Sequence, residues 1–165
     1  MYETPAEVAE LQRLLDASYA RGGSHLKGIH TPERRVSAER LCALLARVCI
    51  LDLATAGARG EPIVAPLDGL FLHGRFCVGT SPLSVRFRHL RRNPAVSAAH
   101  TRGEELSVLV HGTAVEIDTN DPREEPLHAY CREVYPDYDS LGFWGRAGSW
   151  RIEPRAMFAA AFAGP

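Results

Sequence analysis

The sequence has few of the features that mark a disulfide, metal or membrane protein. Its four cysteines, Cys42, Cys49, Cys77 and Cys131, form no CxxC pair and have no zinc-type spacing. We expect reduced, mostly buried thiols and no metal site. No apolar run approaches the roughly 20 residues that span a bilayer, and the acidic start MYETPAEVAELQRLL does not resemble a signal peptide. These absences predict a cytoplasmic protein without a membrane partner.

An excess of either charge is also missing. The 19 basic and 20 acidic residues give a net charge of -1, which argues against a protein that coats nucleic acid or anionic membrane. The sequence has no Walker loop, no dinucleotide fingerprint and no Ser–His–Asp order. An enzyme with this sequence would therefore take its chemistry from a cofactor.

The patterns that are present predict helices first and a mainly β remainder. Pro5 to about Gly22 and Ala38–Val48 carry apolar stripes at helical spacing, and Asn120–Val134 is a further helix. We expect one domain over residues 1–165, with a helical extension over about 1–47. The remainder is predicted to form an antiparallel sheet of about six short strands that closes into a split, Greek-key type β-barrel. The predicted strands cover residues 49–56, 61–72, 76–80, 95–101, 106–118 and 151–154.

One stretch, GTSPLSVRFRHLRRNPAVS, contains four arginines and no acid. With Ser81 as the cap and Pro82 at the first position, residues 81–93 are predicted to form a helix. Leu83, Phe87 and Leu90 would then face the core. The side opposite this stripe is predicted to be a solvated face, made up of Arg88, Arg91 and Arg92. No aromatic residues are interleaved with these arginines for base stacking, so we expect no nucleic-acid partner.

The beginning of this helix has the donors of a phosphate site. Ser81 and Ser84 supply hydroxyl groups, the first turn supplies free main-chain amides, and Arg86 supplies a guanidinium. Upstream, Pro62 and Pro66 interrupt the second strand. Because proline cannot donate to a β-ladder, that strand is predicted to be an edge, bulged, or broken where something else docks.

The histidines have weaker signals. His73 lies at a predicted hairpin turn and His89 on the outer side of the arginine-rich helix, so both are predicted to face solvent. His25 and His30 have no matching carboxylate or cysteine pattern that would make a metal site.

The order of the motifs resembles the pyridoxamine 5′-phosphate oxidase-like, FMN-binding split β-barrel family, which also includes enzymes that use a deazaflavin coenzyme. The resemblance covers roughly Leu51 to Asp118. It is carried by an LAT…G.P…P hairpin, a strand ending in GT, a serine-rich and basic helix ending LRRNP.VS, and a strand with GTA. The family's arginine–histidine pair for a vitamin B6 phosphate is missing, since WRIEPR has Arg151 and Arg155 without a histidine. Vitamin B6 is therefore not the expected substrate.

The resemblance implies a homodimer with the flavin at its interface. Thr80 and Arg86, six residues apart, would hold the cofactor phosphate with Ser84 between them. The main chain of the second strand would hold the ring. The implied cofactor-binding residues are Ala65, Pro66, Leu67, Asp68, Gly79, Thr80, Ser81, Ser84 and Arg86. The implied function is an FMN-dependent oxidoreductase acting on a small organic molecule, with catalytic residues unassigned. The alternatives are a deazaflavin-dependent reductase on the same fold, or a non-catalytic flavin- or haem-binding protein.

Overall fold

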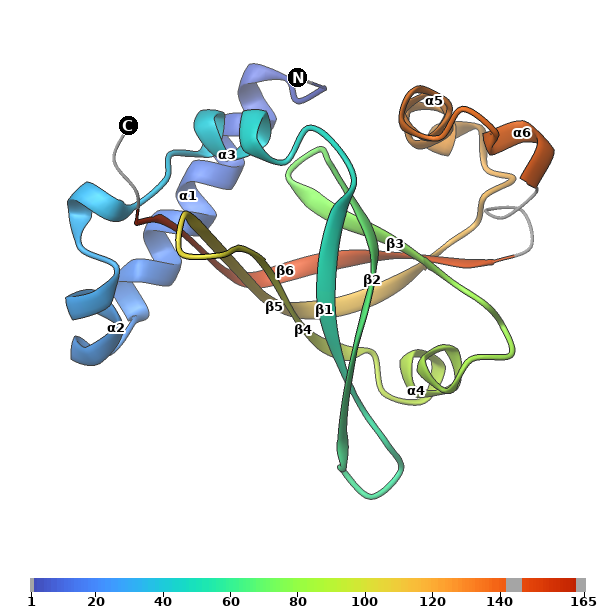
Figure 1. Cartoon of the computed structure of the whole chain (residues 1–165), viewed down its shortest axis with the longest axis horizontal. Helices are drawn as coiled ribbons and strands as arrows, with labels where there is room; N and C mark the ends of the chain where they lie inside the picture. The colour runs from blue at the N-terminus through green and yellow to red at the C-terminus, as the bar shows by residue number, and fades with distance from the viewer. Residues whose placement is uncertain (1, 142–146, 163–165) are drawn as a thin grey trace.

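The computed structural model describes residues 2–141 and 147–162. It confirms the predicted fold class, a closed antiparallel barrel of six strands with flanking helices (Figure 1). Around the barrel the strand order is β1-β2-β3-β6-β5-β4, with β4 pairing back onto β1. The strands are β1 (Cys49–Ala56), β2 (Pro62–Leu72), β3 (Arg75–Thr80), β4 (Ala95–Arg102), β5 (Leu106–Ile117) and β6 (Gly148–Ala161).

The helices lie outside the barrel. Three of them, α1, α2 and α3, lie on one side, whereas α5 and α6 lie on the other (Figure 1). The helices are α1 (Pro5–Arg21), α2 (Ser24–Ile29), α3 (Ala38–Leu44), α4 (Val85–Arg92), α5 (Glu125–Val134) and α6 (Tyr138–Leu141), with short 3-10 turns η1 (Pro32–Arg34) and η2 (Pro122–Glu124). Among the described residues, no helix combines the length and the apolar run that crossing a bilayer requires.

The β2–β3 hairpin shows how local sequence determines a turn. Leu72 pairs with Arg75, which leaves His73 and Gly74 as a two-residue loop. Both residues have positive φ, 52° and 73°. This geometry matches the twist of the flanking strands, and histidine tolerates it better than most non-glycine residues.

Strand β2 has two different halves. From Gly69 to Leu72 it pairs with β3, whereas residues 62–68 pair only with β1. The tip of the β1–β2 hairpin extends away from the barrel (Figure 1). The prediction of an edge segment at Pro62 and Pro66 is therefore confirmed, because among the described residues this half of the strand has no second neighbouring strand.

Two apolar clusters stabilise the chain. The larger fills the barrel and includes Leu51, Leu53, Val78 and Met157. The smaller lies outside it, where Leu127, Tyr130 and Cys131 of α5 pack on Leu70 and Cys77. All four cysteines are free and buried, as predicted.

The arginine-rich helix begins later than predicted. The Ser84 side chain accepts a hydrogen bond from the Phe87 amide at 3.0 Å, so Ser84 and not Ser81 is the cap of α4. Residues 81–84 form a turn, because the Ser84 amide donates to the Ser81 carbonyl at 2.9 Å. Pro82 is the second residue of this turn, where its fixed φ is favourable, just as it is at the first position of a helix. As a result Leu83, predicted to face the core, is 87% exposed.

Other boundaries also differ from the predictions. The segment expected to be a loop after Gly23 contains α2 and η1, and α3 ends at Leu44 instead of Val48. The last strand is longer than predicted, since β6 runs unbroken past Pro154. Next to that proline β6 carries a bulge: His111 of β5 pairs with Ala156 and Gly112 pairs with Pro154, so Arg155 is the extra residue of β6.

Candidate functional site

A pocket of about 190 Å³ lies between α4 and one face of the β1–β2 hairpin. Leu53 of β1 pairs with Ala65 of β2, and Thr55 pairs with Ile63, so all four side chains are on the same face. The start of α4 covers this face. The lining residues are Leu53, Thr55, Ile63, Ala65, Ser84, Val85 and Arg86.

Two predicted phosphate-site residues meet at the start of α4. Thr80 is buried at the end of β3, and its hydroxyl oxygen is 3.0 Å from that of Ser84. Ser84 also accepts from the Phe87 amide, which completes its role as the helix cap. The positive end of the helix dipole and two hydroxyl groups therefore lie together, an arrangement that favours an anion.

Arg86 contributes a cation to the same pocket. It is half-buried, and its guanidinium donates a hydrogen bond to the Ala65 carbonyl at 3.2 Å. Burial lowers the pKa of Arg86, but an arginine remains charged throughout the physiological range. Within the described residues, no acidic side chain forms an ion pair with this guanidinium. Arg86 therefore keeps donors for an anionic ligand.

The unpaired edge of β2 supplies main-chain groups beside Arg86. In an antiparallel strand, the main-chain N–H and C=O of alternate residues point to the same edge. The Gly57 amide donates to the Glu61 carbonyl across the β1–β2 hairpin, so the groups of Ile63, Ala65 and Leu67 point toward β1. Those of Val64, Pro66 and Asp68 point away from it, and Arg86 reaches the Ala65 carbonyl from the side of the pocket. The groups of Val64, Pro66 and Asp68 belong to the half of β2 that has no second strand beside it in the part of the chain that the structure describes.

The other predicted residues lie farther from the pocket. Pro66 and Asp68 are exposed on the opposite face of β2, where the Asp68 carboxylate accepts a hydrogen bond from the Tyr135 hydroxyl at 3.1 Å. Burial, together with the negative charge of Asp68, raises the pKa of Tyr135. Gly79 pairs with Ser149 just before Thr80, and Ser81 is exposed in the turn before α4.

The sequence analysis missed Leu53, Thr55, Ile63 and Val85 as lining residues. Alternation along the two strands is the signal that could have identified the first three, once their pairing register is known. The prediction for His89 was wrong in part. It is half-buried, and its Nδ1 is 3.1 Å from the Thr55 hydroxyl, so it faces β1 and not only solvent.

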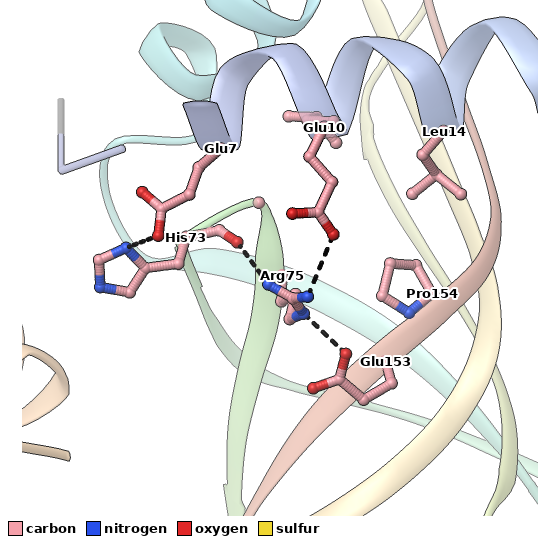
Figure 2. A pocket seen from close by; sticks show the side chains of 9 residues that line it. Glu7, Glu10, Leu14, His73, Arg75, Glu153 and Pro154 are labelled. Atoms are coloured by element: carbon pink, nitrogen blue, oxygen red, sulfur yellow. Dashed lines mark hydrogen bonds and ion pairs between the residues drawn. The ribbon is translucent and has the colours of Figure 1, made fainter. Parts of the chain in front are cut away.

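A second pocket, of about 270 Å³, lies between α1, the β2–β3 turn and β6. His73 is in the turn as predicted, but its Nδ1 is 3.0 Å from a carboxylate oxygen of Glu7. Arg75 lies between Glu10 at 3.5 Å and Glu153 at 2.7 Å (Figure 2). The polar side chains of this pocket therefore contact one another, and these contacts connect α1 to the barrel.

Within residues 2–141 and 147–162, no group of three or more His, Cys, Asp or Glu side chains is arranged to hold a metal ion. The Thr80–Ser84–Arg86 pocket is therefore the best candidate site on the described surface, and its donors suit an anion.

At the level of sequence, no family profile and no curated protein matches the chain. Solved structures do share its fold. One is HutZ, a heme storage protein from Vibrio cholerae, with a TM-score of 0.65 and 19% identity over 78% of this chain and 97% of that protein. A FAD-binding protein from Mesorhizobium loti has a TM-score of 0.58 and 20% identity over 79% and 98% of the two chains.

A third structure, an F420 reductase, has a TM-score of 0.54 and 18% identity over 70% of this chain and 94% of that one. The chain therefore has the split-barrel fold of proteins that are named for flavin, deazaflavin (F420) or heme. Because a shared fold hosts many functions, the function of this chain rests on its own residues.

Proposed function

We propose that this chain is an FMN-dependent oxidoreductase of the pyridoxamine 5′-phosphate oxidase-like class, acting on a small organic substrate. The observation that carries the proposal is the meeting of Thr80, Ser84 and Arg86 at the start of α4, beside an unpaired strand edge. The flavin would supply hydride or electron transfer when bound, and the protein would hold and orient it.

The donor set fits the phosphate of such a cofactor. The Thr80 and Ser84 hydroxyls share one hydrogen bond, so a phosphate at the start of α4 would accept one further hydrogen bond from this pair and others from the Arg86 guanidinium. Charge-assisted bonds to arginine are about twice as strong as neutral ones. The half-buried position of Arg86 strengthens this attraction further, because less water screens it.

The edge of β2 fits the other end of the cofactor. A flavin ring presents carbonyl oxygens and an N–H group along one edge, and these groups match main-chain donors and acceptors. The Val64, Pro66 and Asp68 groups lie on the edge that β1 leaves free. A further strand on this edge would form hydrogen bonds with these groups. Pro62 and Pro66 have no N–H to donate, so they disfavour such a strand and leave the groups available to a ligand.

The size of the pocket supports a second copy of the chain as partner. Its volume of about 190 Å³ is below the roughly 300–1,000 Å³ of complete small-molecule pockets. One chain would therefore enclose only part of a flavin. Apolar side chains are exposed around this pocket: Leu83 at 87%, together with Ile63 and Val85. We propose a homodimer that covers these residues and completes the cofactor site.

The test is titration of the purified protein with FMN, FAD, F420 and heme, followed by fluorescence or absorbance. Tight FMN binding that is lost in Arg86→Ala supports the proposal. Tight F420 binding with FMN ignored would replace FMN by the deazaflavin coenzyme. Preferential heme binding would instead indicate a carrier or storage role, and binding of none of the four would contradict a flavin function.

A further inference from the structure

His89 and Thr55 form a polar contact at the wall of the α4 pocket that the cofactor site described above does not use. Thr55 is buried in β1 and lines the pocket. His89 is half-buried on α4, one turn after Arg86, and its Nδ1 is 3.1 Å from Thr55 Oγ1. The two residues are far apart in the sequence, and packing of α4 on β1 brings them together.

We propose that His89 is a positioning residue that determines whether the Thr55 hydroxyl donates to or accepts from a ligand in this pocket. When Nδ1 carries no proton, it accepts the Thr55 proton, and Thr55 then offers only lone pairs to a ligand. When His89 is protonated, Nδ1 donates to Thr55 Oγ1. The Thr55 proton is then free to donate to a ligand oxygen.

The inference rests on the proposed function, because it assumes a ligand rich in oxygen acceptors. A flavin phosphate or ring carbonyl is such a ligand. Protonation of His89 would then help binding in two ways, through the freed Thr55 donor and through the added positive charge. One neutral hydrogen bond changes affinity by roughly threefold to tenfold.

The other charges on α4 stay constant while His89 titrates. Arg86 and Arg92 lie three residues before and after His89 and so share its side of the helix. Arg88 is exposed and donates to the Leu83 carbonyl. All three arginines keep their charge between pH 5.5 and 8.

The acidic side chains on neighbouring elements also keep their charge between pH 5.5 and 8. Asp52 of β1 is exposed on the face of that strand that points away from the pocket. Glu61 contacts Arg59 at the tip of the hairpin, and Glu116 of β5 lies 3.7 Å from Arg91. Carboxylates ionise below this pH range and imidazoles ionise within it. The experiment therefore compares the imidazole of His89 with a side chain that cannot ionise, while the charges of the neighbouring arginines and carboxylates stay the same.

The experiment measures the FMN dissociation constant between pH 5.5 and 8.0 in the wild type and in His89→Gln. The FMN phosphate itself titrates near pH 6, but that effect is common to both proteins and cancels in the ratio of their affinities. We expect the wild type to gain roughly threefold to tenfold over His89→Gln as the pH falls. Thr55→Ser should keep this gain, whereas Thr55→Val should lose the part that comes from the Thr55 donor and keep only the part that comes from the added charge of His89. His25→Gln, an exposed control on α2, should behave as the wild type.

A second readout uses the ligand-free protein. Nitrogen chemical shifts of the imidazole report the tautomer and titration of His89, and both should change in Thr55→Val while circular dichroism stays native. An affinity ratio that does not vary with pH would overturn the inference. If the wild type binds no FMN, the proposed function fails. In that case the nitrogen chemical shifts of the His89 imidazole decide the inference. If they are the same in Thr55→Val as in the wild type, the inference is wrong.

Discussion

The Arg86 guanidinium lies 3.2 Å from the Ala65 carbonyl, in the half of β2 that pairs with β1 alone among the described strands. The same side chain lies two residues beyond Ser84, which caps α4 and contacts Thr80. Arg86 therefore links the proposed phosphate site to the strand segment proposed to hold the ring. A change at this one residue should affect both halves of the site.

Arg86→Ala should weaken FMN binding by about 2–3 kcal/mol, the range for loss of a charge-assisted hydrogen bond. Because Arg86 also contacts the β2 main chain at Ala65, riboflavin, which lacks the phosphate, should bind more weakly too, but by a smaller factor. Fluorescence titration with both ligands measures the two effects. Arg88→Ala, an exposed arginine on the same helix, is the matched control and should bind FMN as the wild type does. Equal FMN affinity in the two variants would show that Arg86 holds no ligand.

The chain should be a dimer in solution. Light scattering coupled to gel filtration at micromolar concentration should give twice the 18.1 kDa of one chain. Leu83→Asp should shift the dimer toward monomer, because Leu83 is almost fully exposed in the single chain and apolar contacts stabilise interfaces. Lys27→Glu, on α2 at the far side of the barrel, should leave the mass unchanged. A wild-type mass of one chain would contradict both the dimer and the shared cofactor site.

Gly112→Ala should destabilise the fold. A Cβ at this position would lie 2.2 Å from the Glu153 carbonyl oxygen, a main-chain atom that cannot move without opening the β5–β6 ladder. Overpacking of this kind costs roughly 1–3 kcal/mol in the free energy of unfolding. Urea denaturation measures the loss. Gly28→Ala, where no atom lies within 4 Å of the new Cβ, should be neutral or slightly stabilising.

The contact between Glu7 and His73 should make the free energy of unfolding depend on pH. Burial acts to raise the pKa of Glu7, but the hydrogen bonds from Thr4 and the interaction with His73 outweigh it, so the net pKa is lowered. A carboxyl with a lowered folded pKa contributes stability above its ordinary pKa and loses that contribution as the pH falls through the lowered value.

Glu7→Gln should therefore lower the free energy of unfolding at pH 7, by at most about 1 kcal/mol because the pair is partly solvated. The difference from the wild type should shrink as the pH falls below the ordinary pKa of a glutamate and through the lowered pKa of Glu7. Urea denaturation at pH 7 and pH 3.5 measures it, with Glu104→Gln in the exposed β4–β5 turn as the control. A difference that persists at the lower pH would assign the effect to packing and not to charge.

Several features of this protein follow from local sequence alone. Alternation of apolar residues and turn-forming pairs such as His73–Gly74 identify the strands, because side-chain direction and turn geometry are properties of neighbouring residues. The grouping of Thr80, Ser84 and Arg86 is also local. A strand end, a turn and one helical turn connect these residues, so their spacing brings them together without help from the rest of the chain.

Other features were decided only by the tertiary structure. Ser81 and Ser84 can each cap a helix, and the choice of Ser84 leaves Leu83 exposed instead of buried. The contact of Thr55 with His89 depends on how β1 and α4 pack, and that of Glu7 with His73 on where α1 rests. Such contacts depend on the closure of the barrel, which sets the strand register and leaves half of β2 unpaired. Local propensity carries no information about that closure, because the energy that drives it comes from apolar surfaces brought together from across the whole chain.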